Sequence, residues 1–179
     1  LIKAVVALRS VKEACEIEQI NLACNIGYEM HVAAMKHALP GQKEQYIAGL
    51  IEGIAASYGS MVSFPVILSQ NGEPLHKHDH SKTLTVGRMM LTDAGAENNM
   101  CYCSDFTRTV PVGGRFDQRQ KDVYNIVLDC NNKAMEIVRP GVTYQYVHLE
   151  VCKVLAQGLK DLGLMKGDVN AAVAAGAFT

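Results

Sequence analysis

The spacing of hydrophobic residues changes twice along the chain, and this order restricts the folds that the chain can adopt. Residues 10–58 and 117–162 repeat hydrophobic side chains every three to four positions, as amphipathic helices do. Between them, residues 64–69, 89–93 and 100–110 have the composition of strands, and the last two are close enough in sequence to form an antiparallel hairpin. The order of helices, strands and helices predicts an α+β domain with helices packed on one face of a mainly antiparallel sheet.

Local patterns refine the ends of these elements. The segments Ser10–Glu13 and Asp117–Gln120 each match a capping box, in which two side chains accept hydrogen bonds from backbone N–H groups at the start of a helix. Gly27 predicts a break between two helices, because glycine weakens a helix interior. For residues 1–9 we predict a strand or a linker.

The charge balance excludes two classes of binding protein. The chain has 17 basic and 18 acidic residues and a formal net charge of -1. It therefore lacks the basic patch typical of proteins that bind nucleic acids or membrane surfaces. Its apolar runs are too short to cross a bilayer. We expect neither a nucleic acid nor a membrane as a partner.

The cysteines indicate a reducing compartment. None of the six forms a C-x-x-C pair, and four of them lie in predicted helices. This pattern favours reduced thiols in a cytoplasmic protein over a disulfide framework. Cys101 and Cys103 flank one residue in a predicted strand, so both sulfurs should point to the same face, and we predict that they are core residues.

The main candidates for chemistry are Asp93, at the end of one predicted strand, and Asp105, on its predicted hairpin partner. Directly opposed residues of an antiparallel pair have Cβ atoms about 5 Å apart, and two ionised carboxylates that close repel each other unless a cation lies between them. Divalent Mn, Co or Zn ions suit carboxylate oxygens, and one carboxylate can bridge two ions. The structural alternative is that Asp93 caps the hairpin turn and Asp105 pairs with Arg108, since aspartates are common in turns. Taken alone, these residues leave both interpretations open.

The segments around the two aspartates carry a family resemblance. Asp93-Ala94-Gly95 follows the pattern D-x-G, and the run from Ser104 to Gly114 follows S-D-x-T-R-T-x-P-V-x-G. Together they resemble the pita-bread metallopeptidases, which include Xaa-Pro aminopeptidases, prolidases and, more remotely, methionine aminopeptidases. The Thr-Arg-Thr-Val-Pro-Val-Gly run favours the branch that cleaves before proline. The resemblance implies the pita-bread fold, with the two aspartates as ligands of two divalent ions: manganese first, cobalt or zinc as alternatives.

A histidine-rich segment, residues 75–80, precedes the first of these strands. The resemblance places a substrate-contacting histidine in a Leu-His step here. His76 matches it, with a catalytic role in hydrogen bonding to the substrate or the tetrahedral intermediate. We interpret His78 and His80 as loop residues and leave open that one of them lines the pocket. The other histidines lie in predicted helices, where we expect surface or packing positions: His31, His37 and His148.

The resemblance also implies an activity, namely hydrolysis of the bond between an N-terminal residue and a following proline in short peptides, by a cytoplasmic homo-oligomer. The family's P-H-G-x-G-H segment, which carries a further ligand, does not occur in the 179 residues, and two glutamate ligands are expected beyond it. We therefore expect residues 1–9 to enter from an N-terminal domain and residues 10–179 to be a partial catalytic domain. This chain alone should be inactive and should hold metal weakly. The alternative is a non-catalytic binding module with the same fold.

Overall fold

The computed structural model of the chain describes residues 1–70, 72 and 78–178. They form two compact units, Leu1–Arg115 and Phe116–Thr179, and the first unit contains both candidate aspartates. Within these described residues, no helix combines the length and the hydropathy needed to cross a membrane.

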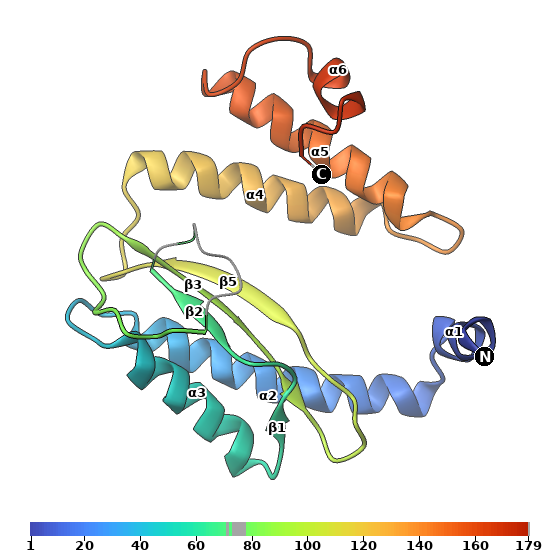
Figure 1. Cartoon of the computed structure of the whole chain (residues 1–179), viewed down its shortest axis with the longest axis vertical. Helices are drawn as coiled ribbons and strands as arrows, with labels where there is room; N and C mark the ends of the chain where they lie inside the picture. The colour runs from blue at the N-terminus through green and yellow to red at the C-terminus, as the bar shows by residue number, and fades with distance from the viewer. Residues whose placement is uncertain (71, 73–77, 179) are drawn as a thin grey trace. The chain divides into compact units, whose positions relative to one another are not determined.

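Three helices open the first unit (Figure 1): α1 (Ile2–Ser10), α2 (Ala14–His37) and α3 (Glu44–Ser57). The strand predicted for residues 1–9 is wrong, because alanine and leucine favour the helical α1 there, and none of its side chains is buried. The capping box predicted at Ser10 is also wrong, since Ser10 ends α1. The box is formed instead by Glu13 and Glu16 at the start of α2.

Gly27 does not break α2, which runs without interruption from Ala14 to His37. A Cβ atom on Gly27 would lie 2.6 Å from Ser104 Oγ and 3.0 Å from the Phe106 ring. Glycine is therefore needed for the close approach of the helix to the segment around Asp105, and the predicted break is wrong for this reason.

Two small antiparallel sheets complete the first unit, one ordered β2-β3-β5 and one formed by β1 and β4. Their strands are β1 (Met61–Val62), β2 (Ile67–Ser69), β3 (Met89–Ala94), β4 (Ala96–Glu97) and β5 (Phe106–Pro111). The predicted antiparallel pairing of the two central strands is confirmed. However, β5 begins six residues later than predicted (106 − 100), because a turn at residues 98–102 occupies the start of the predicted strand.

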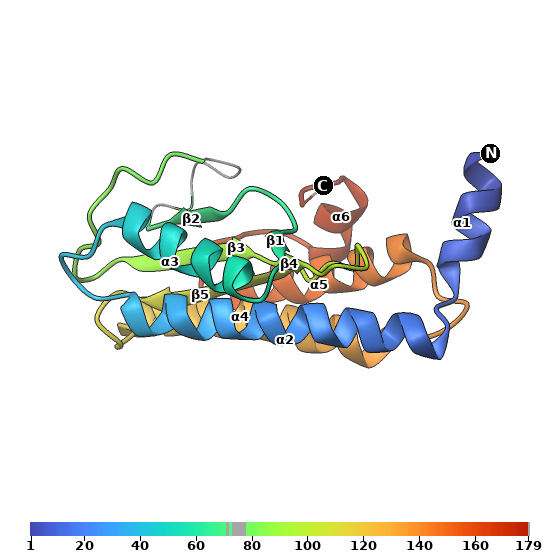
Figure 2. The same cartoon turned by 90° about the horizontal axis from the view of Figure 1, so that it is seen from below.

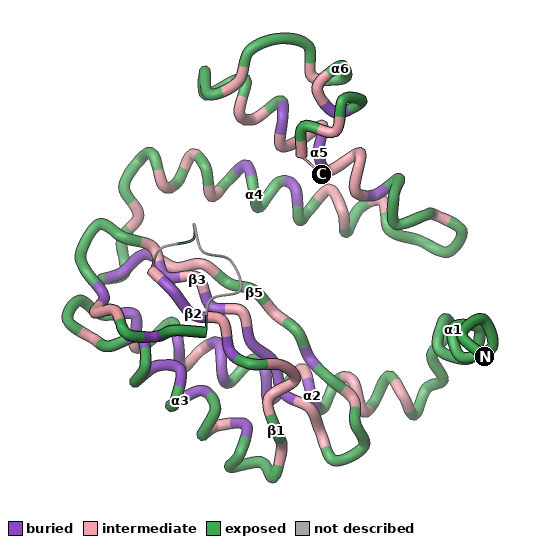
Figure 3. Tube along the Cα trace, in the orientation of Figure 1, coloured by how far each residue is buried: buried purple, intermediate pink, exposed green. Residues whose placement is uncertain are grey.

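The residues of β3 alternate between two environments. Every second residue from Met90 to Ala94 is buried, and every second residue from Met89 to Asp93 is half-buried. The buried face packs against α2 and α3 (Figures 2 and 3) in a core that includes Met30, Ile47, Ile51 and Leu68. Helices thus cover one face of the sheet, as predicted, and Asp93 lies on the other face.

The second unit consists of three helices: α4 (Gln118–Ile137), α5 (Tyr144–Asp161) and α6 (Val169–Ala174). The capping box predicted at Asp117 is confirmed, because its side chain accepts from the Gln120 N–H while the Gln120 side chain accepts from the Asp117 N–H. α4 and α5 approach closely at Gly158, where a Cβ atom would lie 2.7 Å from two carbons of Ile126. The short α6 was not predicted, and it packs on α5 through Val173.

All six cysteines are free thiols, as predicted. Cys101 and Cys103 are exposed, however, so the prediction that they are core residues is wrong. The physical reason is the turn that precedes β5. Cys101 adopts a φ of 61° there, which ends the strand alternation on which the prediction depended.

Candidate metal centre

Asp93 lies in β3 on the face of the sheet that α2 and α3 leave uncovered. The residue directly opposite it on β5 is Thr107, whose hydroxyl donates a hydrogen bond to Asp93 Oδ1 at 2.9 Å. The carboxylate is therefore fixed within a strand. The alternative in which Asp93 caps the hairpin turn is wrong, because the turn lies beyond β4.

Asp105 immediately precedes β5. The neighbouring Ser104 fixes the backbone there, since its N–H donates to the Ala96 carbonyl at 2.9 Å. Because Asp105 is two residues before Thr107, its side chain belongs to the same face of the sheet as Thr107 and Asp93. The prediction that the two aspartates are directly opposed is thus corrected to a diagonal relation, with Thr107 in the opposed position.

The two carboxylates interact with each other. Partial burial raises the pKa of Asp105 above its ordinary value, and the negative charge of Asp93 and a hydrogen bond to Asp93 raise it further. Arg108 makes other contacts: its guanidinium donates to the Thr107 carbonyl at 2.8 Å and lies 5.8 Å from the centroid of the Phe106 ring. These contacts differ from the Asp105–Arg108 pair of the structural alternative.

Two adjacent carboxylates on the sheet face opposite α2 and α3 are suited to a divalent cation. The oxygen donors match the preference of such ions, and a cation would remove the repulsion that raises the pKa of Asp105. Among residues 1–70, 72 and 78–178, no group of three or more His, Cys, Asp or Glu side chains is arranged to hold a metal ion. In the described part of the chain, Asp93 and Asp105 are therefore two candidate ligands, as predicted from the sequence, and no third candidate joins them.

His31 of α2 supports these strands from the covered face. Its Nε2–H donates to the Ala94 carbonyl at 3.1 Å, and its ring meets the Phe106 ring edge to face, with centroids 6.0 Å apart. Only 4% of His31 is exposed, and this burial lowers its pKa, which favours the neutral ring. Ala94 and Phe106 follow Asp93 and Asp105 in the chain, so His31 is a packing residue, as predicted, and fixes the backbone beside both carboxylates.

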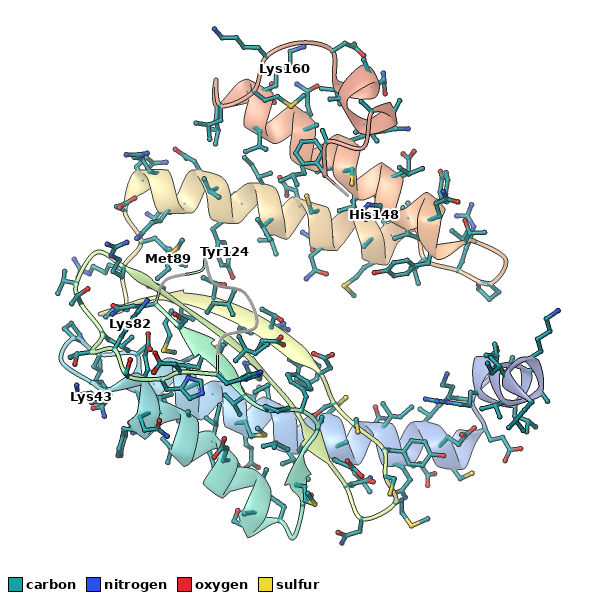
Figure 4. All side chains as sticks on the ribbon, in the orientation of Figure 1. Lys43, Lys82, Met89, Tyr124, His148 and Lys160 are labelled. Carbon is teal, nitrogen blue, oxygen red and sulfur yellow. The ribbon has the colours of Figure 1, made fainter. Side chains whose placement is uncertain are left out.

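The other predicted site residue, His76, lies outside the described residues. Of its neighbours, His78 is exposed, whereas His80 is buried with its Nδ1 3.1 Å from a backbone carbonyl of β2. The chain then reaches Lys82 (Figure 4), whose carbonyl accepts from the Glu44 N–H at 3.0 Å. Because His80 is buried and its ring contacts the β2 carbonyl, it is a packing residue. The role of His76 stays a prediction.

Thr107 is a site residue that the sequence analysis did not identify. Strand alternation places it on the face of Asp105, and the pairing register places it opposite Asp93. The run Ser104-Asp105-Phe106-Thr107 already shows that Thr107 is two residues after Asp105 and so shares its face of a strand. The register was needed to show which β3 residue the hydroxyl meets.

The sequence is similar to a known protein family and to proteins that are named as Xaa-Pro aminopeptidases. Residues 18–173 of the chain match metallopeptidase family M24. The chain is 34% identical over 170 residues to the Xaa-Pro aminopeptidase of Escherichia coli (strain K12), covering 93% of the chain and 38% of that protein. It is 31% identical over 173 residues to a probable Xaa-Pro aminopeptidase of Chaetomium globosum, covering 95% of the chain and 29% of that protein. The chain thus spans less than two fifths of the length of either relative.

Solved structures agree with the sequence comparison. A variant of E. coli aminopeptidase P in complex with substrate matches with a TM-score of 0.90 at 34% identity, covering 95% of this chain and 39% of that chain. Aminopeptidase PepP of Pseudomonas aeruginosa matches with a TM-score of 0.88 at 32% identity, covering 93% of this chain and 38% of that chain. The predicted α+β pita-bread fold is confirmed by these matches. Both comparisons lead to the same conclusion: the chain belongs to metallopeptidase family M24.

Proposed function

We propose that the whole protein is a metal-dependent exopeptidase that hydrolyses the bond between an N-terminal residue and a following proline. The observation that carries the proposal is the proximity of Asp93 and Asp105 on the face of the β3–β5 sheet opposite α2 and α3. The relatives named Xaa-Pro aminopeptidase support the choice of reaction. The motif around Asp105 supports the same choice.

The residues of the candidate metal centre have three different tasks in this proposal. Asp93 and Asp105 would hold two divalent ions, which would supply Lewis-acid chemistry to a carbonyl oxygen and to water. Thr107 donates to Asp93 Oδ1 and so fixes the orientation of that carboxylate, as the partners of metal ligands generally do. From the covered face, His31 holds the strand backbone next to both ligands.

The substrate class follows from the chemistry of proline. A peptide bond before proline is a tertiary amide without an N–H, and the ring fixes φ. Peptidases that bind this N–H therefore lose a contact, and a dedicated site is needed. We assign His76 to this site as a substrate-binding and catalytic group that hydrogen-bonds to the substrate or the tetrahedral intermediate. Short peptides with proline at the second position are the proposed substrates.

Manganese is the proposed metal, with cobalt or zinc as alternatives, since oxygen-rich sites accept several divalent ions. One of the similar solved structures is a zinc-substituted E. coli aminopeptidase P in complex with product, with a TM-score of 0.89. We also propose a cytoplasmic location and a homo-oligomeric state for the whole protein.

The proposed activity is tested with two matched tripeptides, Ala-Pro-Ala and Ala-Ala-Ala, and the whole protein in Mn²⁺ or in a chelator. We expect release of the first residue from the proline peptide only, and only with Mn²⁺. Equal cleavage of both peptides would contradict the assigned specificity. Peptide binding without cleavage in Mn²⁺, Co²⁺ and Zn²⁺ would instead identify the non-catalytic binding module.

The Thr107 hydroxyl should contribute to metal affinity. We expect Thr107→Val, which keeps the size and the β-branch, to weaken Mn²⁺ binding by the whole protein about 10- to 100-fold, as is typical for the partners of metal ligands. Thr107→Ser keeps the donor and should stay close to the unchanged protein. Calorimetric titration of the metal checks this prediction, and equal affinity of the valine and serine variants would contradict it.

A further inference from the structure

A single serine joins the two segments that carry the candidate metal ligands. Ser63 follows β1, which pairs with β4 in the two-stranded sheet (Figure 2). Its N–H donates to the Gly95 carbonyl at 3.0 Å, and its hydroxyl donates to the Ser104 carbonyl at 2.7 Å. Gly95 lies two residues after Asp93. Ser104 lies immediately before Asp105. One residue from a third segment of the chain therefore holds the backbone next to both ligands.

The hydrogen bond between Ser63 and Ser104 lies in a crowded place. A Cβ atom on Gly95 would lie 1.8 Å from the Ser104 carbonyl oxygen and 3.0 Å from Ser63 Oγ. The carbonyl and the hydroxyl thus occupy the space that a side chain at Gly95 would need. Ser63 is half-buried, so the bond is partly shielded from water and is stronger than a fully solvated one. Its short length and close packing restrict the movement of the Ser104 carbonyl.

The orientation of this carbonyl bears directly on Asp105. The carbonyl of Ser104 belongs to the peptide unit that joins Ser104 to Asp105, and a peptide unit is planar. Fixing the carbonyl therefore fixes the plane that contains the Asp105 Cα atom. On the other side of Ser104, its N–H donates to the Ala96 carbonyl at 2.9 Å and its Oγ accepts from the Ala96 N–H at 3.0 Å. Ala96 thus holds the N-terminal side of Ser104, and Ser63 holds the side that leads to the ligand.

We propose that Ser63 is a positioning residue of the metal centre, which sets the separation between the Asp93 and Asp105 carboxylates. This inference rests on the proposed function, in which the two carboxylates hold divalent ions. Carboxylates bind a cation together only when the distance between them suits its coordination sphere, so the backbone that carries them contributes to metal affinity. Thr107 contacts an oxygen of Asp93 directly. Ser63 acts instead through the backbone of both segments.

Replacing Ser63 with alanine tests the proposal, because it removes the hydroxyl and keeps the backbone N–H. We expect Ser63→Ala to weaken Mn²⁺ binding by the whole protein about 10- to 100-fold in a calorimetric titration, the loss typical of residues that orient ligands. Ser63→Thr keeps the hydroxyl and should stay close to the unchanged protein. A second measurement needs no metal. Hydrogen exchange in a chelator, followed by mass spectrometry, should be about two- to tenfold faster at the Ser104 N–H of Ser63→Ala, as expected for the loss of one hydrogen bond.

Ser57→Ala is the matched control. The Ser57 hydroxyl also donates to a backbone carbonyl, that of Ile54, at 2.7 Å, but it lies at the exposed end of α3. This variant should leave both the Mn²⁺ affinity and the exchange of the Ser104 N–H unchanged. If Ser63→Ala is less stable but binds Mn²⁺ as tightly as the unchanged protein, Ser63 only supports the fold and the proposal is overturned. That result would leave the peptidase assignment intact. Absence of Mn²⁺ binding by the unchanged protein would instead contradict the metal centre itself, and this inference with it.

Discussion

Replacing Asp105 with asparagine should lower the Mn²⁺-dependent cleavage of Ala-Pro-Ala by the whole protein at least about a thousandfold. This loss exceeds the 10- to 100-fold effect typical of residues that only orient a ligand, because the variant removes a charged donor to the metal itself. Steady-state kinetics at saturating Mn²⁺ measure it. Asp161→Asn, which removes an exposed charge at the end of α5, is the matched control and should keep full activity.

The same variant should not unfold the protein. In the metal-free state, burial and the Asp93 charge raise the pKa of Asp105, so ionisation of this group is less favourable in the folded than in the unfolded chain. A group with a raised folded pKa loses its stabilising contribution as the pH rises through that pKa. Asparagine cannot ionise, so at neutral pH and in a chelator Asp105→Asn should be at least as stable as the unchanged protein. A variant that lost both activity and folding would leave Asp105 a structural residue and contradict the ligand assignment.

Replacing Gly95 with alanine should lower the free energy of unfolding of the first unit by about 3 kcal/mol or more, at the upper end of the effects of overpacking. A Cβ atom on Gly95 would lie 1.8 Å from the Ser104 carbonyl oxygen and 3.0 Å from Ser63 Oγ. The backbone of Ser104 would have to move, and Asp105 follows it directly in the chain. The variant should therefore also weaken Mn²⁺ binding by the whole protein.

Gly53→Ala provides the matched control for this prediction. Gly53 lies within α3, and a Cβ atom there would meet no atom within 4 Å. Alanine in an open helical position should stabilise by about 0.5–1 kcal/mol. Urea unfolding followed by circular dichroism, with hydrogen exchange to resolve the first unit, measures both variants. If Gly95→Ala unfolds with the same free energy as the unchanged protein, the backbone at Gly95 can move away from Ser104 at no cost in stability. That result would contradict the prediction.

Much of the site could be predicted because its determinants are local. The strand around Asp93 has a strict two-residue alternation, and the motif around Asp105 leads directly into the next strand. Short connections between strands favour antiparallel neighbours, so the proximity of the two aspartates followed from their positions in the sequence. The α4 capping box was predictable for the same reason, because both of its residues lie within one helical turn.

The features that were missed depend on contacts between distant segments. Gly27 has the local character of a helix break, yet its real constraint is Ser104, 77 residues further along (104 − 27). The exact register of β3 and β5 decides that Thr107, rather than Asp105, faces Asp93. The exposure of Cys101 depends on a left-handed residue in a turn that is tied to α2 through Tyr102. Sequence periodicity carries no information on such pairings.

The most direct test of the metal centre is a calorimetric titration of Mn²⁺ into the metal-free whole protein and into its Asp93→Asn/Asp105→Asn double variant. We expect the unchanged protein to bind Mn²⁺ at least about a hundred times more tightly than the double variant, since both described ligands are lost. The Asp161→Asn control should bind as the unchanged protein does. Equal Mn²⁺ affinity of the unchanged protein and the double variant would contradict the assignment of the two carboxylates as the ligands that this chain contributes.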